Sequence, residues 1–223
     1  IAKNERGGGQ AKQTTIDILD RLTERYPALA PLHVNIFEAF QTICKAYNNG
    51  GVLYVCGNGG SAADAEHIVG ELMKSFRKKR PADARIQESL TQMFGETGRI
   101  LGETLEGGLP AISLCSHVSL KSAVANDTDP SNIYAQQLFS LGRAGDCLIA
   151  ISTSGNAENC VRAAMIAKLT GMKTIALTGE KGGRLKEIAE VTISVPEHET
   201  YAVQELHLPV YHCLCAMLEE ELF

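Results

Sequence analysis

A glycine-rich loop could bind an anion such as a phosphate group. The loop runs from Cys56 to Ala65 with the sequence CGNGGSAADA, follows a short apolar run and opens a helical pattern. Backbone N–H groups at the start of a helix point at an anion, and glycine lets the anion approach the backbone closely. The loop also matches the dinucleotide fingerprint G-x-G-x-x-A at Gly57, Gly59 and Ala62.

The fingerprint alone is weak evidence for a dinucleotide cofactor. Proteins that bind NAD carry an acidic residue at the end of the second strand, about 20 residues further on, which binds the ribose. Here the second predicted strand ends at Leu114-Cys115-Ser116, without an acid and much farther along the chain. The sequence contains no Walker A motif either. We therefore disfavour both NAD-dependent chemistry and nucleotide hydrolysis.

A second polar loop follows a later apolar run and again opens a helical pattern. It carries three successive hydroxyl groups at Ser152, Thr153 and Ser154, followed by Gly155. Hydroxyls donate hydrogen bonds to a phosphate monoester, and a helix N-terminus adds partial positive charge. A plain helix N-cap is the alternative, since Ser and Thr are common there. Three hydroxyls before a glycine, at the ligand-binding edge of a parallel sheet, favour the phosphate site.

Polar residues in two helical segments could carry acid–base chemistry. His67 and Glu71 are four residues apart and share a helix face just after the glycine-rich loop. Gln204 and His212 share a face of the last helical segment, about 12 Å apart along its axis. Pro209 lies between them and could kink that helix.

Each of these residues also has a structural interpretation. His67 with Glu71 could be a surface pair. His207 is a rival to His212, but its offset of five residues places it on another helix face. A polar residue in an otherwise apolar helix needs a polar partner, so a satisfied core histidine is the alternative for both.

Alternating patterns predict the elements that position these residues. Two helical segments, from Ile16 to Tyr26 and from His33 to about Ala46, open the chain. Apolar runs typical of buried parallel strands follow at residues 51–56, 109–115, 147–152, 173–178 and 190–195. Helical patterns occupy residues 62–76, 119–124, 132–141, 157–169, 183–189 and 200–222. This order predicts an α/β fold: a three-layer α/β/α sandwich with a parallel sheet, an N-terminal helical hairpin and a long, buried C-terminal helix.

Residues 77–108 interrupt the alternation. Their central part has helical spacing with glycines at Gly95, Gly98 and Gly102, which predicts a helical insertion between the first two strands. The basic run Arg77-Lys78-Lys79-Arg80 could attract a phosphorylated substrate, but we favour a solvated loop. We expect a single domain over residues 1–223, with a disordered N-terminus at residues 1–10.

Composition excludes several classes of protein. The 223 residues are 44% hydrophobic and 21% charged, which indicates a globular chain. The net charge of −5 disfavours a sequence-independent nucleic-acid binder. The apolar runs are far shorter than the roughly 20 residues of a membrane helix, and without an export signal we expect a cytoplasmic protein. Seven cysteines without a C-x-x-C pair are expected to be reduced and packed in the core.

Taken together, the motifs resemble those of a known family. The octapeptide from Gly57 to Asp64, combined with Ser152-Thr153-Ser154-Gly155-Asn156, resembles the sugar isomerase (SIS) domain family. Within it, three further motifs are similar to those of the phosphoheptose isomerases, which act on sedoheptulose 7-phosphate. They are His67-x-x-x-Glu71, Asn126-Asp127 and Gln204-x7-His212. The resemblance covers the chain from about residue 12 onward, except for the insertion at residues 77–108.

The resemblance implies a flavodoxin-like, five-stranded parallel sheet and a homotetramer with active sites at subunit interfaces. It implies phosphate contacts at Ser152, Thr153 and Ser154. It implies other substrate contacts at Asn58, Gly59, Gly60, Ser61, Asn126, Asp127 and Gln204. It also implies a zinc ion held at the positions of His67, Glu71, Gln204 and His212.

The implied reaction is an aldose–ketose shift through an enediol, from sedoheptulose 7-phosphate to D-glycero-D-manno-heptose 7-phosphate. By resemblance, Glu71 is the base beside the carbonyl and His212 is the acid. A residue cannot hold a metal tightly and transfer a proton freely at once. Whether zinc polarises the carbonyl or only shapes the site is therefore open.

Two departures from the family pattern bear on the substrate. The phosphate loop of the family often ends in Ser-Gly-Asn-Ser, and Ala157 replaces that last serine. The loss of one phosphate hydrogen bond puts phosphate affinity or the identity of the sugar in question. The insertion at residues 77–108 could cover the site or reshape the oligomer.

Other functions of the same fold remain as alternatives. One alternative is a non-catalytic scaffold related to proteins that bind the bacterial replication initiator. The tail at Cys213-Leu214-Cys215 resembles that of those proteins, but they typically lack the catalytic histidine and glutamate. A sugar-phosphate-binding regulator would usually carry an added DNA-binding domain, and the two opening helices are too few to suggest one. The presence of Glu71 and His212 favours an enzyme.

Overall fold

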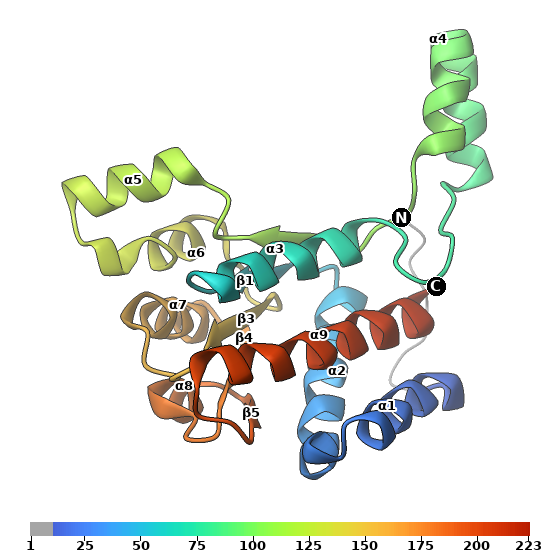
Figure 1. Cartoon of the computed structure of the whole chain (residues 1–223). Helices are drawn as coiled ribbons and strands as arrows, with labels where there is room; N and C mark the ends of the chain where they lie inside the picture. Colours follow the sequence, from blue (N-terminus) through green and yellow to red (C-terminus); the bar gives the residue numbers. More distant parts are fainter. Residues whose placement is uncertain (1–10) are drawn as a thin grey trace.

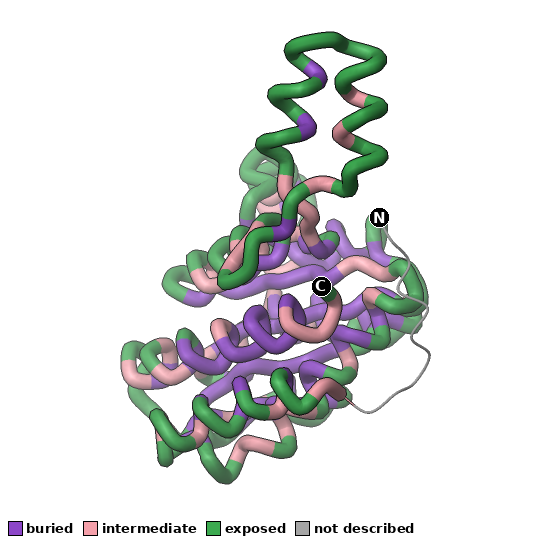
Figure 2. The backbone as a smooth tube through the Cα atoms, turned by 90° about the vertical axis from the view of Figure 1, so that its right-hand side faces the viewer, coloured by how far each residue is buried: buried purple, intermediate pink, exposed green. Residues whose placement is uncertain are grey.

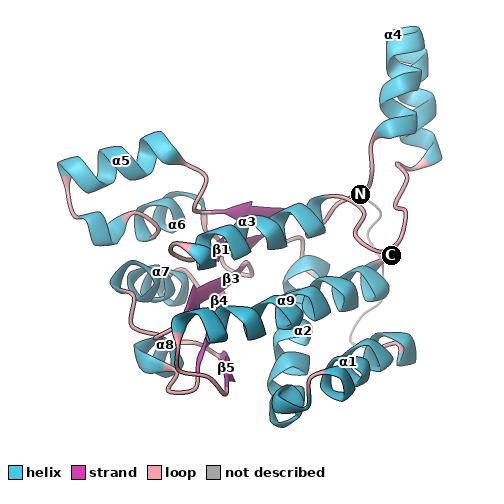
Figure 3. Cartoon of the chain, viewed as in Figure 1, coloured by secondary structure: helices cyan, strands magenta, loops and turns pink. Residues whose placement is uncertain are grey.

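A parallel β-sheet forms the centre of the protein in the computed structural model, which describes residues 11–223. The prediction for residues 1–10 lies outside the described residues. The sheet has the strand order β2-β1-β3-β4-β5, and all four strand pairs are parallel. The strands are β1 (Leu53–Cys56), β2 (Ala111–Ser113), β3 (Cys147–Ser152), β4 (Lys173–Gly179) and β5 (Val191–Val195). This is the flavodoxin-like order, so the predicted fold is confirmed. Figure 3 shows the strands lying among the helices.

Helices cover both faces of the sheet (Figure 1). Crossovers between parallel strands are right-handed. The step from β1 to β2 runs in the opposite direction along the sheet to the steps from β3 to β4 and from β4 to β5. The helices of these two sets of crossovers therefore lie on opposite faces of the sheet. One face carries α2 (His33–Asn48), α3 (Gly60–Met73) and α9 (Thr200–Leu222). The other carries α6 (Ala135–Leu141), α7 (Glu158–Leu169) and α8 (Gly183–Ile188). Helix α5 (Val118–Asp127) leads into a short 3₁₀ helix, η2 (Pro130–Asn132).

The two opening helices pack against the last one. Helix α1 (Gln13–Arg25) is joined to α2 by a 3₁₀ helix, η1 (Pro27–Leu32), and both α1 and α2 contact α9. Helix α2 stops before Gly50, which takes a φ of +78°. Helix α9 is buried along most of its length, including Pro209, and continues through that proline. The predicted N-terminal helices and buried C-terminal helix are confirmed.

Two predicted helix boundaries were wrong. The helix expected over residues 62–76 ends at Met73, because the following backbone turns toward α9. The helix expected over residues 132–141 divides into η2 and α6, which starts only at Ala135. Periodicity marks the presence of a helix better than its ends, which depend on tertiary contacts.

The insertion forms a helical hairpin that projects from the three layers (Figure 2). Helix α4 (Ala84–Thr104) reverses direction at Gly95, which has a φ of +60°. A Cβ atom on Gly98 would lie 1.8 Å from the carbonyl oxygen of Leu90, so only glycine lets the two arms approach this closely. The arms nevertheless leave several large apolar side chains exposed: Ile86, Met93, Phe94, Ile100, Leu101 and Leu105.

The cysteines behave as predicted. All seven are free thiols in the buried part of the protein, and burial raises the pKa of most of them, for example that of Cys44 to about 12. A buried thiol of this kind is unreactive, so the cysteines are packing residues. Among residues 11–223, none of the helices has the length and apolar character needed to cross a membrane.

Candidate functional site

The glycine-rich loop lies at the carboxyl end of β1 and leads directly into α3. Gly59 takes a φ of +56°, and Ser61 is buried in the first turn of the helix. Gly57 has no room for a side chain, because a Cβ there would lie 2.4 Å from the carbonyl oxygen of Ser61. Asn58 exchanges two hydrogen bonds with Asn159 of α7, at 2.8 and 2.9 Å. The loop is thus tied to the helix that follows the neighbouring strand.

The hydroxyl-rich loop lies at the same edge of the sheet, because β3 pairs directly with β1. The N-cap position of α7 is Ala157, which has no capping side chain. The Ser152 hydroxyl accepts a long bond of 3.4 Å from the Ala157 N–H, and the Ser154 hydroxyl accepts from Asn156 at 3.1 Å. None of the three hydroxyl residues is therefore the N-cap residue itself. The plain N-cap interpretation explains the loop less well than an anion site.

Three predicted site residues meet where α3 contacts α9. The Nε2 atom of His67 lies 3.0 Å from the Glu71 carboxylate and 3.5 Å from Nε2 of His212. The two imidazole rings are perpendicular, with centroids 4.9 Å apart. Burial, together with the neighbouring His67, lowers the pKa of His212. This shift favours the neutral imidazole of His212. The cluster is partly open, since 42% of the His67 side chain is exposed.

Two residues without a predicted role, Tyr211 and Asp64, lie beside His67. The Tyr211 hydroxyl donates to Asp64 at 3.2 Å and lies 2.9 Å from Nδ1 of His67. The donor and acceptor roles of the two His67 ring nitrogens depend on its tautomer. With the proton on Nε2, His67 donates to the Glu71 carboxylate at 3.0 Å.

This donor set has the chemistry of a zinc site, because imidazole nitrogen and carboxylate oxygen are ligands that zinc prefers. In the described part of the chain, however, no three His, Cys, Asp or Glu side chains are already grouped to hold a metal ion. His67 lies between Glu71 and His212 rather than equidistant from a common centre. Binding a metal through all three therefore requires a side-chain rotation.

Gln204 lies away from this cluster, at the glycine-rich loop. A Cβ atom on Gly60 would meet the Gln204 amide at 2.7–2.9 Å, so the two residues are in close contact. Gly60 precedes His67 by seven residues, which places Gln204 about 10 Å along α3 from the histidines. Of its two predicted roles, this position supports substrate contact rather than metal binding.

Asn126 and Asp127 make no hydrogen bond to either loop in the described part of the chain. Both lie at the end of α5, and the Asn126 amide donates to Asp127 at 2.8 Å. Helix α5 packs mainly against η2. Figure 1 shows it beyond α6, on the side away from α7. The substrate contact of Asn126 and Asp127 stays a prediction.

The prediction of a solvated basic loop was wrong for Arg80. Its side chain is buried and paired with Glu219 of α9, whereas Lys79 is exposed. The charge run gave no sign of this, because the partner lies 139 residues away. Asp64 and Tyr211 were equally hard to find, although each neighbours a predicted residue: Asp64 lies one turn before His67, and Tyr211 directly precedes His212.

The chain resembles a set of known proteins in both sequence and structure. The SIS domain family matches residues 19–97 and 90–179. A phosphoheptose isomerase of Thermodesulfovibrio yellowstonii is 37% identical over 188 residues, which is 84% of this chain and 81% of that protein. One from a Roseiflexus species is 35% identical over 95% of this chain and 91% of its own length.

Solved structures agree with the sequence comparison. The phosphoheptose isomerase of Neisseria gonorrhoeae superposes with a TM-score of 0.70 at 29% identity, covering 93% of this chain and 96% of that one. A phosphoheptose isomerase of Francisella tularensis gives 0.69 at the same identity, with 93% and 94% covered. The match therefore extends over nearly the whole fold. The chain belongs to the SIS domain family and, within it, to the phosphoheptose isomerases.

Proposed function

We propose that the protein is a sugar-phosphate isomerase that interconverts sedoheptulose 7-phosphate and D-glycero-D-manno-heptose 7-phosphate. The observation that carries this proposal is the meeting of His67, Glu71 and His212 on α3 and α9. A base and an acid on adjacent helices are what an aldose–ketose shift requires. Two similar relatives are named phosphoheptose isomerase, which supports a heptose phosphate as the substrate.

In the proposed reaction Glu71 takes the proton from C1 of the ketose, while His212 gives a proton to the carbonyl oxygen at C2. The product of this step is an enediol. Return of a proton to C2 and loss of the O1 proton then give the aldehyde, so no net oxidation occurs. A neutral imidazole can act as the acid, as its N–H stabilises the oxygen on which charge develops.

The two loops supply the proposed binding contacts. Ser152, Thr153 and Ser154 are proposed to hold the phosphate together with the backbone at the start of α7. Their position next to the glycine-rich loop at one sheet edge supports this assignment. The other proposed contacts to the sugar are Asn58, Gly59, Gly60, Ser61, Asn126, Asp127 and Gln204.

We also propose a zinc ion at His67, Glu71 and His212. Gln204, the fourth predicted ligand, lies at the glycine-rich loop and would have to move to reach the ion. The imidazole and carboxylate groups that meet here support a bound cation, because both are ligands of zinc. When bound, zinc would polarise the carbonyl as a Lewis acid. Equilibrium dialysis of the purified protein with zinc, compared with His67→Ala, tests this assignment without an activity measurement.

A homotetramer with active sites at subunit interfaces is proposed as the assembly. The exposed part of the His67 side chain, and the lack of a hydrogen bond from Asn126 or Asp127 to the loops within residues 11–223, support a site completed by another chain. Light scattering coupled to size-exclusion chromatography would give the mass. A cytoplasmic location is proposed as well, and seven buried free thiols agree with a reducing compartment.

The direct test is an isomerase assay on sedoheptulose 7-phosphate, with added zinc and with a chelator. Turnover that responds to metal supports both the enzyme and the zinc site, whereas turnover indifferent to metal keeps only the acid and base. Tight binding without turnover would instead favour the scaffold or regulator of the same fold. No binding and no turnover would refute the proposed substrate.

A further inference from the structure

A buried ion pair lies directly behind the acid–base cluster. Arg80 follows the end of α3, and 2% of its side chain is exposed. Its guanidinium donates to the carbonyl oxygens of Glu71 at 3.1 Å and Leu72 at 3.2 Å, in the last turn of α3. Its Nε atom lies 3.2 Å from the carboxylate of Glu219 on α9. Arg80 therefore links the backbone that carries Glu71 to the neighbouring helix.

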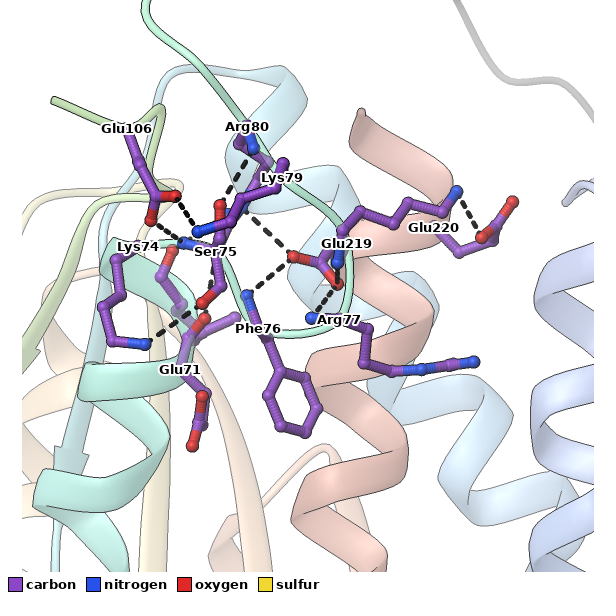
Figure 4. Close-up of polar contacts among 12 residues, drawn as sticks. Glu71, Lys74, Ser75, Phe76, Arg77, Lys79, Arg80, Glu106, Glu219 and Glu220 are labelled. Atoms are coloured by element: carbon purple, nitrogen blue, oxygen red, sulfur yellow. Dashed lines mark hydrogen bonds and ion pairs between the residues drawn. The ribbon is translucent and has the colours of Figure 1, made fainter. Parts of the chain in front are cut away.

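Glu219 holds the turn that follows α3 (Figure 4). Its carboxylate, 3% exposed, accepts from three successive backbone N–H groups: Phe76 at 2.9 Å, Arg77 at 2.8 Å and Lys78 at 3.1 Å. Three amide donors satisfy the buried carboxylate, and the positive charge of the guanidinium beside it offsets a negative charge that would otherwise be very unfavourable away from water. The Nε–H of Arg80 lies at ion-pair distance but makes no hydrogen bond among the described residues. Residues 76–78 are thereby fixed against α9.

The turn at residues 76–78 also contacts His212, another member of the acid–base cluster. The ring of Phe76 packs against the imidazole of His212, with centroids 5.7 Å apart. His212 lies on α9 two turns before Glu219. The same ion pair thus constrains Glu71 through its backbone and His212 through Phe76.

We propose that Arg80 and Glu219 are positioning residues that set the relative placement of Glu71 and His212. The role in turnover rests on the proposed function, whereas the geometric role does not. Buried ion pairs are poor contributors to stability, and apolar residues of similar volume often replace them without loss. A misplacement of about 1 Å in a catalytic group can reduce the rate by 10²-fold, so positioning affects the rate separately from any effect on stability.

The test compares Arg80→Lys, the double variant Arg80→Met with Glu219→Leu, and the control Lys79→Met. Lysine keeps the charge but cannot reproduce the arginine fork, so its effect separates geometry from charge. Lys79 pairs with Glu106 in the same turn but is exposed, so its removal should change little. The measurements are kcat, KM, the melting temperature and the ¹⁵N-edited spectrum of the His212 ring.

Positioning predicts that kcat falls by about 10- to 100-fold in both Arg80 variants while KM stays within about threefold. The His212 ring resonances should shift, because Phe76 moves, while Lys79→Met remains like the wild type. A purely structural role predicts lower melting temperatures with unchanged kcat per folded molecule and unchanged His212 resonances, and that result would overturn the proposal.

The spectrum separates this proposal from the proposed function. If the wild type turns over none of the sugar phosphates tested, the enzyme assignment fails, and the His212 resonances alone decide the positioning role. If the double variant does not fold, Arg80→Lys decides it in the same way. Unshifted His212 resonances in a folded Arg80 variant reject positioning in either case.

Discussion

The hydroxyl of Tyr211 lies 2.9 Å from Nδ1 of His67 and donates its proton to Asp64. This relationship orients the His67 ring and leaves Nε2 to face Glu71. Burial raises the pKa of Asp64, and the bond from Tyr211 opposes that shift. A carboxylate, a hydroxyl and an imidazole thus form one chain of hydrogen bonds across α3 and α9.

Removing the hydroxyl of Tyr211 should therefore disorder His67. We expect Tyr211→Phe to lower kcat by about 10- to 100-fold, the usual range for residues that orient a ligand or catalytic histidine. The melting temperature should fall slightly, because Asp64 loses a partner worth about 1–3 kcal/mol. Steady-state kinetics and thermal denaturation check both effects. An unchanged kcat would show that His67 needs no orientation by Tyr211.

Replacing the proposed base and acid should remove turnover without unfolding the chain. General acid–base catalysis contributes about 10²- to 10⁴-fold, so Glu71→Gln and His212→Asn should each lose at least that much of kcat. Neither change alters side-chain volume greatly, and circular dichroism should match the wild type. Near-normal turnover in either variant would reject the assignment.

Acid stability should depend on His207, which is fully buried. Burial lowers its pKa to about 4 from 6.5, and the ring lies 3.2 Å from the carbonyl oxygen of Thr178. The unfolded chain binds a proton below pH 6.5, whereas the folded chain does so only below about pH 4. Stability is therefore full above pH 6.5 and falls by about 3 kcal/mol as the pH drops toward 4.

The variant His207→Gln keeps a donor for Thr178 but cannot titrate. Urea unfolding at pH 7.5 and pH 4.5 should show a smaller loss of stability on acidification in this variant than in the wild type. Other carboxylates titrate in both proteins, so the difference between the two isolates His207. Equal losses would mean that His207 is not neutral in the folded state.

Restoring the serine that the family loop usually carries should help both stability and binding. Ala157 is the N-cap residue of α7 and has no capping side chain, so Ala157→Ser should add about 1 kcal/mol. That corresponds to about 2–4 °C in melting temperature for a chain of this size. The new hydroxyl should also lower KM for a sugar phosphate. Ala157→Gly, which adds no hydroxyl, is the control and should leave KM unchanged.

Excision of the α4 hairpin should leave the three-layer fold intact. Its arms pack on each other, and its base is already closed by a bond of 3.1 Å from the Ala82 N–H to the Leu105 carbonyl oxygen. Replacing residues 84–104 by a short Gly-Ser linker should preserve cooperative unfolding. Circular dichroism on heating checks this, and a loss of cooperativity would show that the hairpin supports the core.

Local sequence signals were sufficient for the architecture. The apolar runs, the turn glycines and the helical periods identified the five strands and the helices between them, because each signal depends on residues close together in the chain. The two loops could be placed at one sheet edge for the same reason, since loops after parallel strands meet there. Helix ends at Met73 and Ala135 were missed, because contacts from elsewhere decide them.

The sequence by itself therefore determined the fold class, both candidate anion-binding loops and the candidate acid and base. Only the tertiary structure decided what surrounds them: Tyr211 against His67, Gln204 against Gly60, and Arg80 in a buried pair with Glu219. These partners lie more than 130 residues apart in the chain. No periodicity or charge pattern encodes such a pairing, because it depends on how α3 and α9 pack side by side.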